Sequence, residues 1–312
     1  MDLPKTPIHV TPLGVDEFFY HKPDWLDREE LRKRYALKER VVLVVGMGQP
    51  RKNLERILGA FSSLDKEIQN KASLVVVGEG WHVNSRAEQE VKYLGIQDHV
   101  VVTGEVSRSQ LWILYHLADL LCYPSLYEGF GLPILEAMAC ETPVIASDCG
   151  AMKEIASDAA YLVNPQSIQD IAKAMREILQ DTDMATRHKA SGKERSRNFT
   201  WDKTAAQTLC GYEAAVKAKE KKQNPDYAVA QCKEKRKTNI GIDARFYGMV
   251  HTGTGRYTTG IVDALLKNKE QRFTLLGMPV SLERENVTVV PERKSKVLDA
   301  EWEQNELKKR IQ

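Results

Sequence analysis

The chain has 312 residues, 42% of them hydrophobic, and a formal net charge of +2 at pH 7. This length suggests about two domains with enough apolar side chains for cores, and the small net charge argues for neither a nucleic acid nor an acidic partner. The five cysteines are widely spaced without a C-x-x-C pair, which indicates neither a zinc site nor a disulfide framework. No apolar run approaches the ~18 residues of a transmembrane helix, and no signal peptide is evident. We expect a cytoplasmic protein and leave peripheral membrane contact open.

Residues 1–22 contain two prolines in the first seven positions and then a short predicted strand and a turn, which we interpret as a linker. A charged helix over 24–37 follows. Apolar strands then alternate with helices: strands at 41–46, 73–78, 99–104, 120–125 and 159–164, helices at 53–64, 86–94, 109–118 and 167–179, and polar helical residues up to 218. Near-continuous apolar runs are typical of parallel strands buried on both faces. The alternation predicts an α/β fold with a doubly wound parallel sheet, whose ligands bind beyond the carboxyl ends of the strands.

Residues 217–237 contain eight Lys or Arg and few large apolar side chains. We interpret them as a solvated linker, with a basic anchor on anionic lipid as the alternative. Residues 238–312 then predict the opening of a second α/β domain, in about 75 residues that are too few for a complete doubly wound unit. Its predicted elements are strands at 239–245, 272–277 and 287–292, a glycine loop leading into a helix within 251–268, and a charged helix over 301–312.

The stretch 124–154 predicts a strand end, a glycine-rich turn, a helix, a second strand and a second loop. Glu128 and Glu136 lie eight positions apart across the turn, where two glycines flank Phe130 and allow positive φ and close approach to a ligand. A carboxylate in the first turns of a helix, near free N–H groups, suits a polyol or a phosphate. Glu136 is expected to point away from the helix's buried stripe, which comprises Leu132, Leu135, Met138 and Ala139.

A second candidate site lies where the first predicted strand ends, at Gly46 and Gly48, followed by Arg51 and Lys52. Adjacent cations between a strand and a helix N-terminus suit a diphosphate, and a solvated Arg-Lys pair is the alternative. A nicotinamide dinucleotide site is rejected, because Arg51 stands where G-x-G-x-x-G requires its third glycine.

Other signals are weaker. The backbone of Gly80 and Val106 could contact a nucleotide base, although ordinary turns would give the same pattern. The paired glutamates could be an acid/base pair, a hydroxyl-binding pair or surface charges. No metal site is expected, because the histidines considered have no ligand-like spacing: His82, His99, His116 and His188.

The residues EGFGLPILEAMACETPVIASDCGAMKEI, with PRKNL and TGEVS, resemble the retaining nucleotide-sugar glycosyltransferases of family four, which have the GT-B fold of two facing Rossmann-like domains. The resemblance covers residues 10–216 and corresponds to the C-terminal, donor-binding domain. It implies that Glu128 holds the donor sugar, together with the backbone of Gly129, Phe130, Gly131 and Leu132. It further implies that Glu136 binds the ribose and that Arg51 and Lys52 offset charge on the leaving diphosphate. No metal or other cofactor is then needed.

Two positions depart from the family's pattern. Met47 stands where many relatives have arginine, which leaves diphosphate binding more dependent on Arg51 and Lys52. Glu141 replaces a usual glycine and is expected only to alter a turn.

Residues 240–266 resemble the beginning of a family-four N-terminal domain, in which Gly253 and Gly255 would form a loop facing the donor diphosphate and the acceptor. We therefore expect part of a tandem enzyme, with circular permutation as the alternative. The expected order is an entry linker (1–22), a donor domain (23–216), a charged linker (217–237) and a truncated domain of a second unit (238–312).

The resemblance implies transfer of a hexose with retention, mannose from GDP-mannose first and UDP-sugars next, to a growing polysaccharide such as an O-antigen. The acceptor would be a glycan or a lipid-linked glycan. The missing domains of the parent chain would complete the site, so this chain alone is expected to be weakly active or inactive. The alternatives are a GT-B nucleotide-sugar epimerase and a non-catalytic nucleotide-binding scaffold.

Overall fold

A computed structural model of the chain describes residues 8–46, 48–81, 85–223, 239–244, 247–248, 253–269, 271–278 and 287–291. The chain divides into two compact units, one of Val15–Phe199 and one of Met1–Gly14 with Thr200–Gln312. We describe each unit by itself. Among the described residues, no helix combines the length and the apolar character needed to cross a lipid bilayer.

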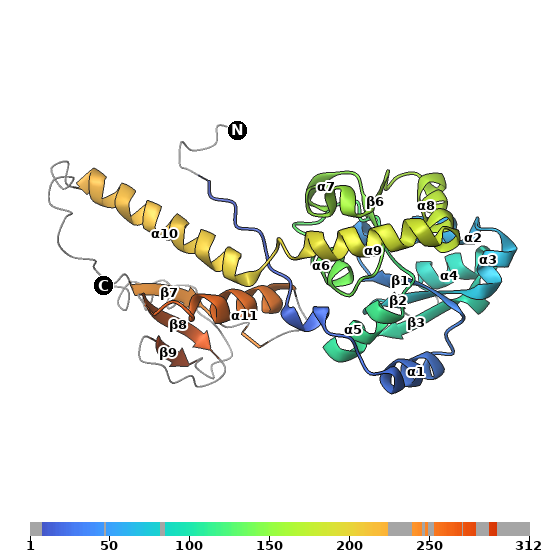
Figure 1. Cartoon of the computed structure of the whole chain (residues 1–312), viewed down its shortest axis with the longest axis horizontal. Coiled ribbons are helices and arrows are strands. Elements are labelled where there is room, and N and C mark those ends of the chain that lie inside the picture. Colours follow the sequence, from blue (N-terminus) through green and yellow to red (C-terminus); the bar gives the residue numbers. More distant parts are fainter. Residues whose placement is uncertain are drawn as a thin grey trace. The chain divides into compact units, whose positions relative to one another are not determined.

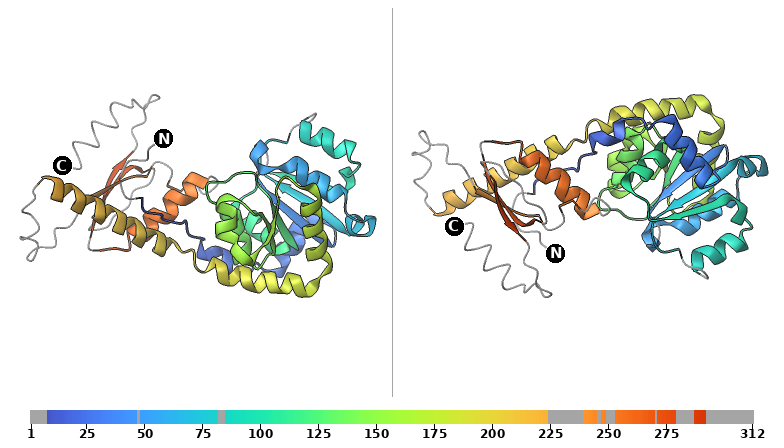
Figure 2. Two further views of the ribbon diagram at one scale, coloured as in Figure 1. Left: turned by 90° about the horizontal axis from the view of Figure 1, so that it is seen from above. Right: turned by 90° about the horizontal axis from the view of Figure 1, so that it is seen from below.

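The larger unit is built on one six-stranded parallel sheet with the strand order β3-β2-β1-β4-β5-β6. This order is that of a doubly wound sheet whose direction of winding reverses between β1 and β4, so the predicted fold class is confirmed. Figures 1 and 2 show helices on both faces of the sheet. The strands are β1 (Arg40–Val45), β2 (Ala72–Val77), β3 (Val100–Gly104), β4 (Leu120–Tyr123), β5 (Val144–Ser147) and β6 (Tyr161–Val163).

The described helices of this unit alternate with the strands. They are α1 (Trp25–Arg34), α2 (Leu54–Ser62), α3 (Lys66–Lys71), α4 (Arg86–Tyr93), α5 (Arg108–Leu117), α6 (Leu132–Ala139), α7 (Gly150–Ala156), α8 (Ile168–Gln180) and α9 (Thr182–Ser196). Short 3₁₀ turns lie at η1 (Glu17–Tyr20), η2 (Pro50–Lys52), η3 (Gln97–His99) and η4 (Ser157–Ala159).

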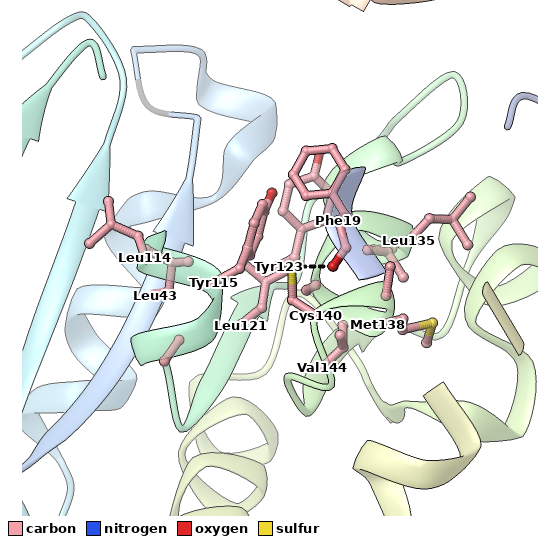
Figure 3. Packing of buried hydrophobic residues seen from close by; sticks show 14 of the residues in the cluster. Phe19, Leu43, Leu114, Tyr115, Leu121, Tyr123, Leu135, Met138, Cys140 and Val144 are labelled. Atoms are coloured by element: carbon pink, nitrogen blue, oxygen red, sulfur yellow. Dashed lines mark hydrogen bonds between the residues drawn. The ribbon is translucent and has the colours of Figure 1, made fainter. Parts of the chain in front are cut away.

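Each face of the sheet has its own core, because successive side chains of a strand point to opposite faces. Val41 and Leu43 of β1 belong to one buried cluster, and Val42 and Val44 belong to the other. The first cluster includes residues of α5 and α6, seen in Figure 3. This double burial explains why the strands read as continuous apolar runs rather than as alternating patterns.

The predicted N-terminal boundary and its strand were wrong. Residues 8–16 form no strand, and η1 follows them. Val15 and Phe19 are 6% and 2% exposed and belong to the core of the larger unit. The Val15 N–H donates to the Phe199 carbonyl at 3.0 Å, so residues 15–22 are part of this unit and not only a linker.

Two helices escaped the sequence analysis. The short helix α3 hides its polar Gln69 completely, and the Gln69 amide donates to the carbonyls of Ser62 and Leu64 at 2.8 and 2.6 Å. A buried glutamine breaks the apolar pattern that would reveal a helix. The predicted second loop after β5 is also wrong, because α7 forms there and buries Met152 and Ile155.

The smaller unit has a three-stranded parallel sheet of β7 (Asn239–Asp243), β8 (Arg272–Met278) and β9 (Val287–Pro291), with helix α11 (Gly253–Leu265). The three predicted strands are thus present, whereas the helix predicted over 301–312 lies outside the described residues. Helix α10 (Trp201–Gln223) belongs to this unit and packs on α11, and its Ala205 is part of the same core as Ile240 and Phe273. The larger unit therefore ends at Phe199 rather than at residue 216, the end predicted for the donor domain, and the first part of the predicted linker is helical.

Candidate functional site

The carboxyl ends of β1 and β4 lie side by side, where a doubly wound sheet offers its ligand crevice. Three loops meet at this edge. The Leu126 N–H donates to the Arg51 carbonyl at 2.7 Å, and the Asn53 amide donates to the Pro124 carbonyl at 2.9 Å and the Pro165 carbonyl at 2.6 Å. These bonds hold the loop after β1 against the loops after β4 and β6.

Glu128 lies at the centre of this edge and is bound by both predicted cations. Lys52 Nζ is 2.7 Å from Glu128 Oε1, and Arg51 forms an ion pair with Glu128 Oε2. The Tyr123 hydroxyl donates to Glu128 Oε1 at 2.9 Å and accepts from Lys52 Nζ at 2.6 Å. The side chains of Glu128 and Lys52 are 9% and 13% exposed, and that of Arg51 is 39% exposed. We call these four side chains the Glu128 cluster.

The charges of the cluster are well defined. Burial raises the pKa of the Glu128 carboxyl, but Lys52, the Tyr123 hydroxyl and Arg51 outweigh burial, so this pKa lies below its usual value. Burial raises the pKa of Tyr123, and the Glu128 charge raises it further, so the phenol stays a neutral donor. The cluster therefore presents two cations against one carboxylate, an excess of positive charge that suits an anion.

Glycines shape the loop that carries the cations. Gly46 has φ +86°, and a Cβ there would lie 2.9 Å from Cε of Lys52. Gly48 has φ +83°, and its Cβ would lie 2.8 Å from the Glu79 carbonyl and 3.4 Å from the Cα of Gly80. The structure thus brings Gly46, Gly48 and Gly80 to one sheet edge, whereas Met47 lies outside the described residues.

The turn before α6 also lies near this edge. Gly129 is exposed, Gly131 has φ +115°, and Phe130 packs edge-on against Phe199 with ring centroids 6.1 Å apart. Leu132 begins α6 and is buried. Val106 follows β3 and packs against the core cluster that includes β1 and α5. Their contacts with a ligand stay predictions.

Glu136 does not point away from the core as predicted. All eight residues of α6 are buried, and Glu136 is only 2% exposed. The Tyr115 hydroxyl donates to Glu136 Oε2 at 2.9 Å. The helix has no solvent-facing side because α5, α7, α9 and η1 pack around it against the sheet. The ribose role of Glu136 stays a prediction.

The two glycines of the smaller unit do not form the predicted loop. Helix α11 begins at Gly253, so Gly253 and Gly255 belong to its first turn. Residues 249–252, which precede them, lie outside the described residues.

Sequence reasoning missed Tyr123 and Asn53. A tyrosine as the last residue of a buried strand was the available signal for Tyr123, because a buried hydroxyl needs a partner. Asn53 directly follows the two cations and adopts φ +64°, which asparagine tolerates better than most residues. Among the described residues, no group of three or more His, Cys, Asp or Glu could hold a metal ion. The absence of a metal requirement stays a prediction.

The comparison with protein families decides the identity of this fold. The sequence model of the family "Glycosyl transferases group 1" matches residues 27–195, more than half of the 312 residues. The chain belongs to this family. The matched range contains the Glu128 cluster, and the six-stranded sheet is the GT-B type of domain that the resemblance implied.

Two curated relatives and one solved domain illustrate the match. The MMP alpha-(1->4)-mannosyltransferase of Mycolicibacterium hassiacum is 31% identical over 67% of this chain and 49% of its own length. The GDP-mannose-dependent alpha-(1-6)-phosphatidylinositol monomannoside mannosyltransferase of Mycobacterium tuberculosis is 33% identical over 65% of this chain and 55% of its own length. The chain thus spans about half the length of these relatives.

The solved C-terminal domain of LpcC, a glycosyl transferase group 1 family protein from Francisella tularensis, is 25% identical with a TM-score of 0.51. The match covers 59% of this chain and 97% of that domain. The part of this group 1 chain that resembles it therefore corresponds to one domain of a glycosyltransferase.

Proposed function

We propose that the larger unit binds a nucleoside-diphosphate sugar and, in the full-length protein, transfers a hexose with retention to a growing polysaccharide, with an O-antigen as the first candidate. Mannose from GDP-mannose is the favoured donor, because both curated relatives described above are named mannosyltransferases and one is named GDP-mannose-dependent. The observation that carries the proposal is the pairing of Arg51 and Lys52 with Glu128 at the carboxyl edge of the sheet.

The proposed chemistry begins with an exchange of ion-pair partners within the Glu128 cluster. The donor diphosphate takes over Arg51 and Lys52, and Glu128 then accepts hydrogen bonds from the sugar hydroxyls. Glu136 binds the ribose, the backbone of Gly129 to Leu132 supports the sugar, and that of Gly80 and Val106 contacts the base. The two cations stabilise the negative charge that builds up on the diphosphate as it leaves. Electrostatic stabilisation of this kind usually supplies most of an enzyme's rate enhancement. No metal is therefore required. Departure and acceptor attack on one face give retention.

The opposite wall of the site comes from residues outside the larger unit, supplied by missing domains of a longer parent chain. The acceptor is a glycan or lipid-linked glycan, reached at the inner face of a membrane by peripheral contact. The 312-residue chain alone is then weakly active or inactive. Rapid mannose transfer by this purified chain would contradict that part of the proposal.

Calorimetric titration with GDP, UDP and ADP tests donor binding. We expect GDP to bind most tightly and Lys52→Ala to weaken it at least about tenfold, since a charge-assisted contact contributes roughly 1.5–3 kcal/mol. Lys92→Ala is the matched control, because Lys92 is 62% exposed and pairs on the helix surface with Glu88 at 2.9 Å. Absence of nucleotide binding, or equal losses in both variants, would favour the scaffold alternative. The family match and the mannosyltransferase relatives do not favour an epimerase.

A further inference from the structure

A cavity of about 190 Å³ opens in the larger unit, away from the Glu128 cluster. Its lining includes Lys22, Arg28, His116, Cys140, Glu141 and Lys189. His116 lies in the last turn of α5, which leads into β4, and Glu141 lies between α6 and β5. Helices of a doubly wound sheet run back to the amino ends of the strands, so this cavity lies at the edge opposite the candidate donor site. The proposed function makes no use of it.

The wall of the cavity is fixed by specific hydrogen bonds. The His21 carbonyl accepts from Trp112 Nε1 at 3.0 Å and from His116 Nε2 at 2.9 Å. The Cys140 thiol donates to the Phe19 carbonyl at 3.3 Å, the contact dashed in Figure 3. These bonds hold the segment from Phe19 to Lys22 against α5 and the end of α6.

His116 adds no positive charge here. Burial lowers its pKa to about 4, and the charges of Arg28 and Lys22 lower it further, against the raising effects of the His21 hydrogen bond and of Glu141. Because a carbonyl only accepts, the neutral ring carries its proton on Nε2.

The remaining charges leave an excess of cations. Lys22, Arg28 and Lys189 line the cavity, and Glu141 is the only carboxylate among the lining residues that the structure describes. Glu141 Oε1 is already bound by Lys193 Nζ at 2.7 Å, and Lys22 Nζ lies 3.7 Å from the same oxygen. Among the described residues, Arg28 Nε is buried and has no hydrogen-bond partner. A buried donor without an acceptor is costly.

The opposing explanation is that these cations only offset the negative ends of α5 and α6. In that case the carbonyls at the ends of these helices should accept hydrogen bonds from the cationic side chains. The buried Nε of Arg28 has no such acceptor among the described atoms, so a helix-end role leaves it unexplained.

We propose that this cavity binds a phosphate group, held by Arg28, Lys189 and Lys22. Its volume is below the ~300 Å³ at which pockets for drug-sized ligands begin, so a single phosphate fits the site better than a whole nucleotide. The group is supplied either as free phosphate or by a phosphomonoester lipid headgroup. Glu141 weakens the binding by its charge.

Calorimetric titration of the 312-residue chain with inorganic phosphate at constant ionic strength tests the proposal. The Lys52→Ala background is used, because the Glu128 cluster also attracts anions. We expect one saturable site, and Arg28→Gln with Lys189→Gln should weaken it roughly tenfold, or about 1.4 kcal/mol. Lys33→Gln with Lys153→Gln removes the same charge from exposed positions outside the lining and should leave the affinity unchanged.

Two single variants guard against misfolding of the double variant. Lys189 is exposed, so Lys189→Gln should fold normally and still weaken phosphate binding severalfold, whereas Glu141→Gln should strengthen it. No saturable binding up to about 10 mM phosphate, or equal losses in the two double variants, would overturn the proposal.

Vesicles of phosphatidylcholine with and without phosphatidic acid distinguish the two sources. The lipid headgroup is identified if the chain sediments with phosphatidic acid vesicles, if Arg28→Gln with Lys189→Gln abolishes this sedimentation, and if the control pair of substitutions leaves it unchanged. Binding of inorganic phosphate alone identifies the free ion. If the chain binds neither inorganic phosphate nor phosphatidic acid vesicles, the proposed phosphate site is rejected. The proposed nucleotide binding is unaffected by that outcome, because it is tested separately with Lys52→Ala.

Discussion

At the residue scale, Glu128 determines the state of the candidate donor site. Its carboxylate is bound by Arg51, Lys52 and the Tyr123 hydroxyl, and its pKa is lowered in consequence. A group whose pKa is lowered by folding stabilises the native state above its unfolded pKa, and the effect is lost as pH falls through the folded pKa. The cluster should therefore contribute to acid unfolding.

We expect Glu128→Gln to destabilise the chain at pH 7, because it leaves two cations without their carboxylate. As pH falls below 4.5, the ordinary pKa of a glutamate, protonation of Glu128 should progressively remove the difference in unfolding free energy between the two proteins. Urea unfolding of both proteins between pH 7 and pH 3 measures it. Glu67→Gln is the control, since Glu67 is 83% exposed and pairs with Lys71 on the surface of α3. A difference that stays constant with pH would exclude the ionic role of Glu128.

At the element scale, helices α10 and α11 of the smaller unit approach each other at a glycine. A Cβ on Gly260 of α11 would lie 2.3 Å from the ring of Trp201. A Cβ on Gly211 of α10 would meet nothing closer than 3.6 Å. Both glycines lie inside helices, so they separate the effect of packing from that of helix propensity.

We expect the two glycine substitutions to have opposite effects. Gly211→Ala should stabilise the smaller unit by about 1 kcal/mol through helix propensity. Gly260→Ala should destabilise it by about 1–3 kcal/mol, because the helices must move apart to admit the methyl group. Hydrogen exchange of α11 and β7 amides measures both effects. Stabilisation by Gly260→Ala would show that α10 does not pack there.

At the scale of the whole molecule, the chain has separate cores. The two clusters on either side of the six-stranded sheet share no residue with the cluster around Ile240 and Phe273. Two units with independent cores are expected to unfold as two cooperative steps.

Scanning calorimetry should therefore resolve two transitions. If the proposed function holds, GDP should raise the transition of Val15–Phe199, because a ligand stabilises only the unit that binds it. Gly260→Ala should lower the other transition alone. A single transition that responds to both changes would show that the units unfold together.

The sequence predicted the sheet and much of the candidate site from local patterns. Continuous apolar runs such as residues 41–46 indicated strands buried on both faces, and this holds for β1. Glycines next to Arg51 and Lys52 indicated an anion site, and the structure places both cations together at the sheet edge. Helix α3 and the orientation of Glu136 could not be predicted. Both have a buried polar side chain, Gln69 and Glu136, and the periodicity of apolar residues in a sequence does not show that a polar residue is buried.

The sequence by itself determined the fold class and the family, because both depend on short-range patterns of strands, turns and motif residues. Only the tertiary structure decided which residues meet. It joined Glu128 to Arg51, Lys52 and Tyr123, buried α6 on every side, and moved the domain boundary to Phe199. It also brought Lys22, Arg28 and Lys189 around one cavity. Contacts between distant segments depend on how the helices pack on the sheet, and local sequence does not record that packing.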